Sequence, residues 1–209
     1  MIDPVGHIID KWGLKHHPMS HMPIMIPNSS RRDLAKLFQE LGYRTGAEIG
    51  TGRGSYAISL NRYNPECRLY CIDPWERYDE LKDWPDANIL NEHYIAAKAR
   101  LGKFPKVSII RKRSMDALYQ FADNSLDFVF IDANHSFPYV AEDIFFWEKK
   151  VRPGGIVSGH DYLKAPRPDL VVQVREVVDA YTEAFKIRKW FVVDEASAKR
   201  CGSWFWVKE

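Results

Sequence analysis

The feature that most constrains this fold is a repeated alternation of short apolar runs with longer segments of helical spacing. The runs with the length of strands are Ala47–Ile49, Leu69–Ile72, Val107–Ile110, Leu126–Ile131, Ile156–Ser158, Ile187–Val193 and Trp204–Val207. The segments with helical spacing are Ser55–Tyr63, Ala87–Leu101, Met115–Phe121, Tyr139–Lys150 and Leu170–Phe185. Strands that alternate with helices predict βαβ units and a parallel sheet covered on both faces. Because such crossovers are right-handed, we expect a doubly wound α/β fold.

The C-terminal end departs from this alternation. No helical segment separates the strands predicted at Ile187–Val193 and Trp204–Val207. Two successive strands with a short polar connection predict an antiparallel hairpin. The sheet is therefore expected to be mostly parallel and seven-stranded, with an antiparallel hairpin at its C-terminal end.

The N-terminal segment also differs from the rest. Ser30 and Asp33 have the spacing of a capping box, which predicts that a helix begins there. We therefore expect residues 29–209 to form one domain. Three of the prolines in residues 1–28 are expected to interrupt helices, and we expect an irregular arm or lid there. These prolines are Pro18, Pro23 and Pro27.

Composition excludes several classes of protein. The 209 residues carry a formal net charge of only +2, whereas a dedicated nucleic-acid-binding protein is usually strongly basic. No stretch approaches the roughly 20 apolar residues of a membrane-spanning helix, and the first residues lack the pattern of a secretory signal. The 3 cysteines are too few for a disulfide framework, so we expect reduced thiols and a cytoplasmic location.

A glycine-rich loop follows the first predicted strand of the domain. Gly50, Gly52 and Gly54 stand at alternate positions, directly before a predicted helix. Such a loop lets a ligand approach the backbone at the start of a helix. A dinucleotide fingerprint would need glycine where this chain has Ser55, and the carboxylate of Glu48 would repel a pyrophosphate. The loop therefore favours a ligand with an amino group or a positive charge.

A second carboxylate follows the next predicted strand. Asp73 stands where the carboxyl end of that strand meets the edge of the sheet that binds ligands in this fold. A carboxylate at this position accepts hydrogen bonds from the hydroxyls of a ribose. Together with the loop, it predicts a ligand that has a ribose and an ammonium group but no phosphate.

Four segments in this order resemble one known family. They are AEIGTGRGSYA, CIDPW, FVFIDANHSF and RPGGIVSGHDY. Over residues 44–163 the chain resembles the class I S-adenosylmethionine-dependent methyltransferases, in particular their catechol-type and macrolide-sugar-type O-methyltransferases. The resemblance implies a Rossmann-like sheet, S-adenosylmethionine as cofactor, and methyl transfer to a small molecule, with a hydroxyl oxygen as the expected acceptor.

The resemblance also implies a role for each motif residue. The glycine loop would line the methionine part of the cofactor, Glu48 would lie near its amino group, and Asp73 would bind its ribose. Ser114 and Met115 would face the adenine, and Asp132 would border both cofactor and substrate. Trp75 would either stack near the adenosine or pack internally. The full set of expected cofactor residues is Glu48, Gly50, Thr51, Gly52, Gly54, Asp73, Pro74, Trp75, Ser114, Met115 and Asp132.

Two chemical devices could activate an acceptor hydroxyl. One is a general base, and the resemblance assigns this role to His135, beside Asp132, because imidazole titrates near neutral pH. The other is a divalent ion, Mg²⁺, Mn²⁺ or another, for which the resemblance implies Asp132, His160 and Asp161 as ligands. A histidine ligand would disfavour Mg²⁺, which prefers oxygen. Without a metal, Asp132 would orient the cofactor, and His160 and Asp161 would bond to backbone groups.

The helix predicted after His135 carries three acidic residues. Glu142, Asp143 and Glu148 alternate with apolar side chains, so we expect them on its exposed face.

Two other functions stay open from the sequence. One is an NAD-type oxidoreductase, against which Glu48 and Ser55 argue. The other is a protein that binds S-adenosylmethionine without catalysis. We expect a small-molecule substrate and neither nucleic acid nor membrane as partner; whether the chain forms a homodimer stays open.

Overall fold

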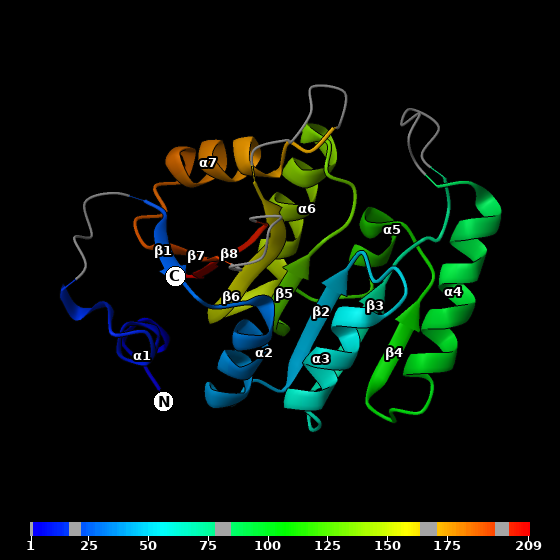
Figure 1. The fold of residues 1–209 in the computed structure, drawn as a ribbon, viewed down its shortest axis with the longest axis horizontal. Coiled ribbons are helices and arrows are strands. Elements are labelled where there is room, and N and C mark those ends of the chain that lie inside the picture. The colour runs from blue at the N-terminus through cyan, green and yellow to red at the C-terminus, as the bar shows by residue number, and fades with distance from the viewer. Residues whose placement is uncertain (1, 17–21, 78–84, 164–170, 195–200) are drawn as a thin grey trace.

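The sheet has one strand more than expected. A computed structural model describes residues 2–16, 22–77, 85–163, 171–194 and 201–209. They form one eight-stranded sheet in the order β1-β7-β8-β6-β5-β2-β3-β4 (Figure 1). Its strands are β1 (Ile24–Pro27), β2 (Thr45–Ile49), β3 (Arg68–Ile72), β4 (Val107–Ile110), β5 (Leu126–Ile131), β6 (Val151–Tyr162), β7 (Trp190–Asp194) and β8 (Gly202–Val207). The expected mostly parallel α/β sheet is confirmed.

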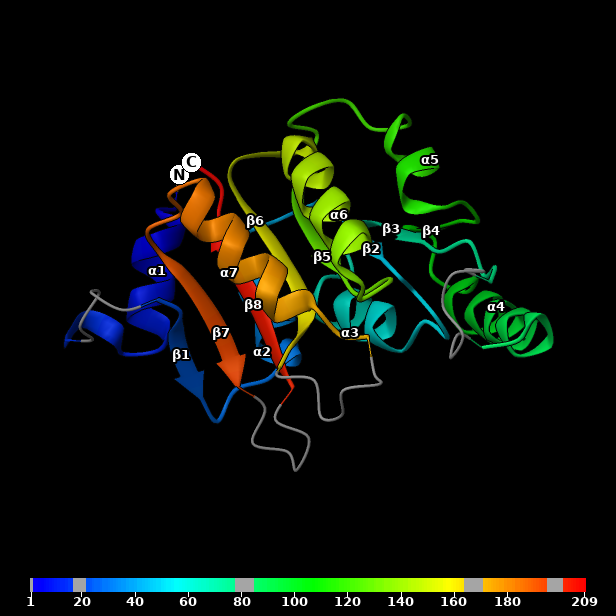
Figure 2. The ribbon, with the colours of Figure 1, turned by 90° about the horizontal axis from the view of Figure 1, so that it is seen from above.

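Helices cover both faces of this sheet. The helices are α1 (Pro4–Lys11), α2 (Arg31–Glu40), α3 (Ser55–Tyr63), α4 (Ala87–Leu101), α5 (Ser114–Leu118), α6 (Phe137–Lys150) and α7 (Val174–Ala184), with a short 3-10 turn, η1 (Leu14–His16). The buried side chains of α1 to α4 share one core with Phe128 and Phe130 of β5, and those of α5 to α7 share another with Val129 and Ile131. Figure 2 shows α6 and α7 side by side on one face. None of the helices in these ranges is long and apolar enough to cross a membrane.

The strand alternation explains this two-sided core. Along β5, Phe128 and Phe130 point to one face and Val129 and Ile131 to the other, because successive side chains of a strand alternate. All four are buried. A strand buried on both faces must be apolar throughout, which is why the sequence of β5 reads as a continuous apolar run.

The C-terminal hairpin is confirmed. β7 and β8 pair antiparallel, with Trp190 opposite Trp206, and β8 lies between β7 and β6. The capping box predicted for α2 is also present: Ser30 accepts a hydrogen bond from the backbone N–H of Arg32, and Asp33 accepts one from the backbone N–H of Ser30.

The N-terminal segment differs from the irregular arm that we expected. Residues 4–11 form α1, because Asp3 caps the helix and Pro4 stands at its first turn, where proline is tolerated. β1 adds an eighth strand, parallel to β7, with Ile24 opposite Phe191. Pro27 fits there because β1 is an edge strand. The prolines therefore do not keep this segment from joining the sheet.

A substitution in β1 tests whether the N-terminal segment contributes to folding. Ile24 is fully buried, so we expect Ile24→Ala to lower the free energy of unfolding by about 2–5 kcal/mol. Met25, the next residue, is 42% exposed, and Met25→Ala should change it by less than about 0.5 kcal/mol. Urea unfolding of both variants measures the difference. Equal stability of the two variants would show that β1 is detached from the core in solution.

Candidate functional site

The predicted site residues gather where β2 and β5 end. These neighbouring parallel strands mark the point at which strand order reverses, since β3 and β4 lie beyond β2 and β6 lies beyond β5. The backbone ties the strand ends together: Asp132 donates its N–H to the carbonyl of Ile49 at 2.7 Å, and Gly50 donates to that of Ile72 at 2.8 Å. A doubly wound sheet opens a crevice at such a point.

The glycine loop is packed directly against β5. Gly50 has a φ of +89°, and a Cβ atom on it would lie 2.0 Å from the carbonyl oxygen of Asp132. Only glycine therefore fits at position 50. The loop ends at Gly54, whose left-handed backbone caps the start of α3.

Asp73 holds the loop from the neighbouring strand. Its two carboxylate oxygens accept hydrogen bonds from the backbone N–H groups of Gly52 at 2.8 Å and Trp75 at 2.7 Å. Burial raises the pKa of this carboxyl group, while the two backbone bonds oppose the shift. The indole N–H of Trp75 donates to the carbonyl of Gly52 at 2.8 Å, and its ring is buried against Tyr94. Trp75 therefore braces the loop by internal packing.

A cavity of about 250 Å³ opens between these elements. The predicted residues that line it are Gly50, Gly52, Asp73, Pro74, Trp75, Ser114 and Asp132. The lining residues that the sequence analysis missed are Ile49, Ile72, Glu76, Pro85, Leu90, His93, Ala133 and Asn134. Most of the missed residues adjoin a predicted one or lie on α4, whose contact with the site no motif indicated.

Four predicted cofactor residues do not line this cavity: Glu48, Thr51, Gly54 and Met115. Glu48 is buried at the end of β2, and burial raises the pKa of its carboxyl group to about 8, an effect to which the charge of Asp132 adds and which Arg31 opposes. Within the described part of the chain, Glu48 Oε2 and Thr51 Oγ1 are buried without a hydrogen-bond partner. A buried polar atom without a hydrogen-bond partner lowers the stability of the fold unless a ligand bonds to it.

The expectation of an exposed acidic face on α6 was wrong for Asp143 and for Glu148, which is half-buried and accepts hydrogen bonds from Tyr181 and Trp206. Glu142 is exposed, but Asp143 is 4% exposed and accepts a hydrogen bond from the hydroxyl of Ser114. Trp147 Nε1 donates to the same hydroxyl at 2.7 Å. Burial raises the pKa of Asp143 to about 7. The sequence held this signal, because Val140, Asp143 and Trp147 stand at the spacing of one helix face.

A turn after β5 orients His135. The side-chain oxygen of Asn134 accepts hydrogen bonds from the N–H of Ser136 at 3.0 Å and from its hydroxyl at 2.9 Å. The N–H of Gln173 donates to the carbonyl of His135 at 2.8 Å. Asparagine stabilises such turns by bonding to the backbone two residues ahead. Both ends of the short segment are thus fixed.

His135 lies between two carboxylates. Its Nε2 atom is 3.0 Å from Oδ2 of Asp161 and 3.5 Å from Oδ1 of Asp132, and Arg31 Nη1 lies 3.5 Å from Oδ2 of Asp132. Burial by itself would lower the pKa of the imidazole, but the two carboxylates outweigh it and raise the pKa to about 10. The imidazole is therefore protonated at neutral pH, which differs from the near-neutral titration that we expected. The same contacts hold the pKa of Asp161 well below its ordinary range.

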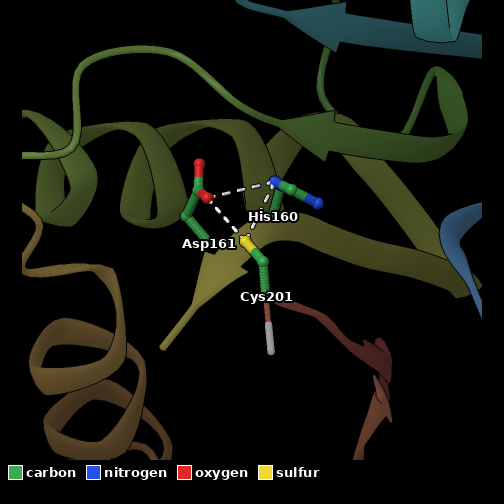
Figure 3. Close-up of side chains that lie close together, drawn as sticks. All are labelled: His160, Asp161 and Cys201. Carbon is green, nitrogen blue, oxygen red and sulfur yellow. Dashed lines mark hydrogen bonds and ion pairs between the residues drawn. The ribbon is translucent and has the colours of Figure 1, made fainter. Parts of the chain in front are cut away.

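The three predicted metal ligands do not form a single cluster. In the described ranges, Asp132 and Asp161 group with His135, whereas His160 groups with Asp161 and Cys201 (Figure 3). Cys201 Sγ lies 2.7 Å from Oδ1 of Asp161, and burial raises the pKa of its thiol. The combination of Asp132, His160 and Asp161 expected from the resemblance thus does not fit one ion, because His160 faces Cys201.

Sequence reasoning missed two residues beside Asp132 and Asp161. Arg31 reaches Asp132 from the first turn of α2, and Cys201 reaches Asp161 from the residue before β8. Both are distant in sequence from the residues that they meet, and neither stands in a recognisable motif. Only the strand order, with β8 beside β6, could have indicated the contact of Cys201.

Comparison with known families gives one match. Residues 47–162 match the model of a family described as a methyltransferase domain. The matched range begins in β2 and ends at the last residue of β6, so it contains the glycine loop, Asp73 and the segment from Asp132 to Asp161. No curated protein matches the sequence.

Solved structures share the fold at low sequence identity. The O-methyltransferase TomG from Streptomyces achromogenes, in complex with SAM, is 21% identical with a TM-score of 0.63, over 100% of this chain and 91% of its own. An O-methyltransferase from Bacillus cereus in complex with SAH is 17% identical with a TM-score of 0.61, over 98% and 90%. The N-methyltransferase NodS from Bradyrhizobium japonicum is 18% identical with a TM-score of 0.56, over 86% and 95%. O- and N-methyltransferases thus share this fold.

The charge of His135 leads to a prediction about stability. Because folding raises its pKa from 6.5 to about 10, the stabilisation is fully present below pH 6.5 and is lost as the pH rises through about 10. We expect His135→Gln to lower the free energy of unfolding at about pH 6 by at least about 1 kcal/mol, equivalent to roughly one pKa unit. The loss should be much smaller above the raised pKa.

Urea unfolding at the two pH values measures this difference. His7→Gln controls for replacing a histidine elsewhere, since His7 pairs with Glu40 at the other end of the sheet. An equal loss of stability in His135→Gln at both pH values would contradict the buried ion pair.

Proposed function

This chain belongs to the family of methyltransferase domains, and from that premise we propose that it transfers the methyl group of S-adenosylmethionine to an oxygen of a small molecule. The observation that carries the proposal is the cavity beside Gly50 and Asp73, where a loop that admits only glycine meets a carboxylate fixed by two backbone bonds. When bound, S-adenosylmethionine supplies a methyl group on a positively charged sulfur.

The residues around the cavity suit this cofactor. Each oxygen of Asp73 already accepts one backbone hydrogen bond and has a further lone pair for a ribose hydroxyl. Asn134 lines the cavity, and its Nδ2 atom is buried without a hydrogen-bond partner among the described residues. This donor suits a ring nitrogen of the adenine, since its own carbonyl oxygen is engaged by Ser136. Ser114 borders the same region.

The charges near the cavity favour a cation. Glu48, Asp73 and Asp132 bring three carboxyl groups to the ends of β2, β3 and β5. Glu48, whose pKa burial raises to about 8, would ionise more readily beside an ammonium or sulfonium group. The negative charge of a pyrophosphate would instead repel all three carboxylates. This pattern favours S-adenosylmethionine over NAD and argues against the oxidoreductase alternative.

We infer that His135 is the proton acceptor for the substrate hydroxyl. Because Asp132 and Asp161 raise its pKa, the imidazole must first lose a proton to solvent before it can accept the proton of the substrate hydroxyl. A positive charge bound beside Asp132 favours that loss, because like charges repel. Asp132 then orients the imidazole and stabilises its positive charge after it has accepted the substrate proton. No step in this scheme needs a metal ion.

The first test of this function is binding of the cofactor product. We expect S-adenosylhomocysteine to bind the purified chain in a calorimetric titration and NAD not to bind. Asp73→Ala should weaken binding by about 1.5–3 kcal/mol, the typical value of hydrogen bonds to a charged group. Gly50→Ala should abolish it, because the added Cβ would meet the backbone of Asp132.

Asp123→Ala is the matched control, since this carboxylate pairs with Lys150 on the surface. It should bind as the unaltered chain does. Binding of NAD alone, or equal affinity in Asp73→Ala and Asp123→Ala, would overturn the proposed cofactor site.

The second test concerns methyl transfer. With labelled S-adenosylmethionine and a panel of phenols, sugars and carboxylates, we expect His135→Gln to slow transfer to the best acceptor by about 10²–10⁴-fold. Its affinity for S-adenosylhomocysteine should stay within a few-fold. The rate of the unaltered chain should rise with pH above neutrality, because His135 must lose its proton.

The pH profile distinguishes a base from a residue that only supports the fold. Loss of the rising limb in His135→Gln supports the assignment, whereas an unchanged rate and profile would move the base elsewhere. If binding persists but no acceptor in the panel is methylated by any variant, the remaining alternative is a binding protein without catalysis.

A further inference from the structure

Two neighbouring strands bring three chemically different donor atoms together beyond Asp132. His160 Nδ1 lies 3.2 Å from Oδ1 of Asp161, and Cys201 Sγ lies 2.7 Å from that oxygen and 3.6 Å from Nδ1. Figure 3 shows the three side chains converging, two from β6 and one from the residue that precedes β8. A nitrogen, an oxygen and a sulfur thus face one another.

This convergence depends on an irregularity in the sheet. In a regular strand, His160 and Asp161 would point to opposite faces. Here β6 advances from Gly159 to Tyr162 while β8 advances only from Trp204 to Gly202, so β6 carries one extra residue. Asp161 takes up the extra length with a φ of +56°, an unusual value for a residue other than glycine. Bulges of this kind redirect side chains beside functional sites.

We propose that His160, Asp161 and Cys201 bind one thiophilic divalent ion, with Zn²⁺ as the expected occupant. Imidazole, carboxylate and thiolate are the three ligand types that zinc sites use, and three protein ligands leave a fourth position for water or substrate. Thiolate ligation disfavours Mg²⁺ and Mn²⁺, which prefer oxygen. On binding, Cys201 loses its thiol proton to solvent as the sulfur–metal bond forms, and His160 releases any proton on Nδ1 to solvent, because a ligating nitrogen must be unprotonated.

The donor spacings suit a tetrahedral ion. Zinc–ligand distances of about 2.0–2.3 Å give ligand–ligand distances of about 3.3–3.6 Å in a tetrahedron. Two of the three measured distances, 3.6 Å and 3.2 Å, are close to these values. The contact of 2.7 Å between Sγ and Oδ1 is a hydrogen bond from the thiol, and it has to lengthen when an ion replaces the thiol proton.

The neighbouring cluster of Asp132, His135 and Asp161 is the rival position for an ion. There, however, His135 Nε2 already pairs with both carboxylates, and Arg31 approaches Asp132. An ion at that position would have to break both contacts of His135 and compete with the guanidinium of Arg31. The cluster with Cys201 uses Oδ1 of Asp161 and leaves Oδ2 of that residue in contact with His135.

Cobalt substitution tests the site on the full chain. After treatment with a chelator, titration with Co²⁺ should produce a thiolate-to-cobalt charge-transfer band in the near ultraviolet, and Zn²⁺ should displace it at one ion per chain. Cys201→Ser should remove the band, and His160→Gln should weaken binding by about 10–100-fold or more. A chain that gives no band with Co²⁺ overturns the proposal.

Two variants serve as controls. Cys67→Ala changes a buried cysteine outside the cluster and should keep the band. Asp132→Asn removes a carboxylate of the rival cluster and should keep it too. If Asp132→Asn loses Co²⁺ binding while Cys201→Ser retains it, the ion belongs to the rival cluster and the proposal is wrong.

A measurement on the unaltered chain covers the case in which Cys201→Ser does not fold. Zn²⁺ should slow the alkylation of Cys201 by iodoacetamide at least about tenfold, as judged by mass spectrometry, because a bound thiolate is shielded. Unchanged alkylation would overturn the proposal. None of these readouts uses a methyl acceptor or S-adenosylhomocysteine, so failure of the metal site and failure of the proposed function are separate results.

Discussion

The contact between the glycine loop and the end of β5 fixes the geometry of the site. Gly50 leaves no room for a side chain against the carbonyl of Asp132, and the N–H of Asp132 is bonded to Ile49. Because β2 and β5 are neighbours whose crossovers leave in opposite directions, the crevice opens at this contact. The loop forms one wall of the cavity, and Asp132 begins the turn that carries His135. The cofactor pocket and the proposed base are therefore both positioned by the backbone contact between the glycine loop and the end of β5.

The electrostatics of the site follow from this crowding. Asp132 and Asp161 would repel each other across the crevice, and the positively charged His135 between them compensates the two charges. Burial disfavours every one of these charges, so their mutual contacts decide which of them persist. A cationic cofactor beside Asp132 competes with the imidazole for the same carboxylate. In the proposed site, cofactor binding would therefore be linked to the protonation of His135, the residue that we assign as the base.

Local sequence patterns predicted the elements whose causes are local. The apolar run of β5 and the spacing of α7 correspond to what the structure contains, since a buried strand and an amphipathic helix leave direct periodic signals. β1 was missed because it is short, contains Pro27 and gains its stability from β7, which lies far along the chain. The raised pKa of His135 depends on Asp161, whose position is set by a bulge that no periodic pattern indicates. Asp143 shows the opposite case, in which the helical spacing was informative and the charge of the residue was misleading.

The bulge in β6 also explains how one carboxylate can belong to two groups. With Asp161 in the left-handed region, its Oδ2 atom faces His135 and its Oδ1 atom faces His160 and Cys201. A regular β6 would pair each residue with β8 in turn and send one of these neighbours to the opposite face. The extra residue interrupts the pairing of β6 with β8 and places Asp161 in a strained backbone conformation. Such strain persists only where the surrounding contacts enforce it. The flanking pairs Gly159–Trp204 and Tyr162–Gly202 supply those contacts, so Asp161 is held by the sheet itself.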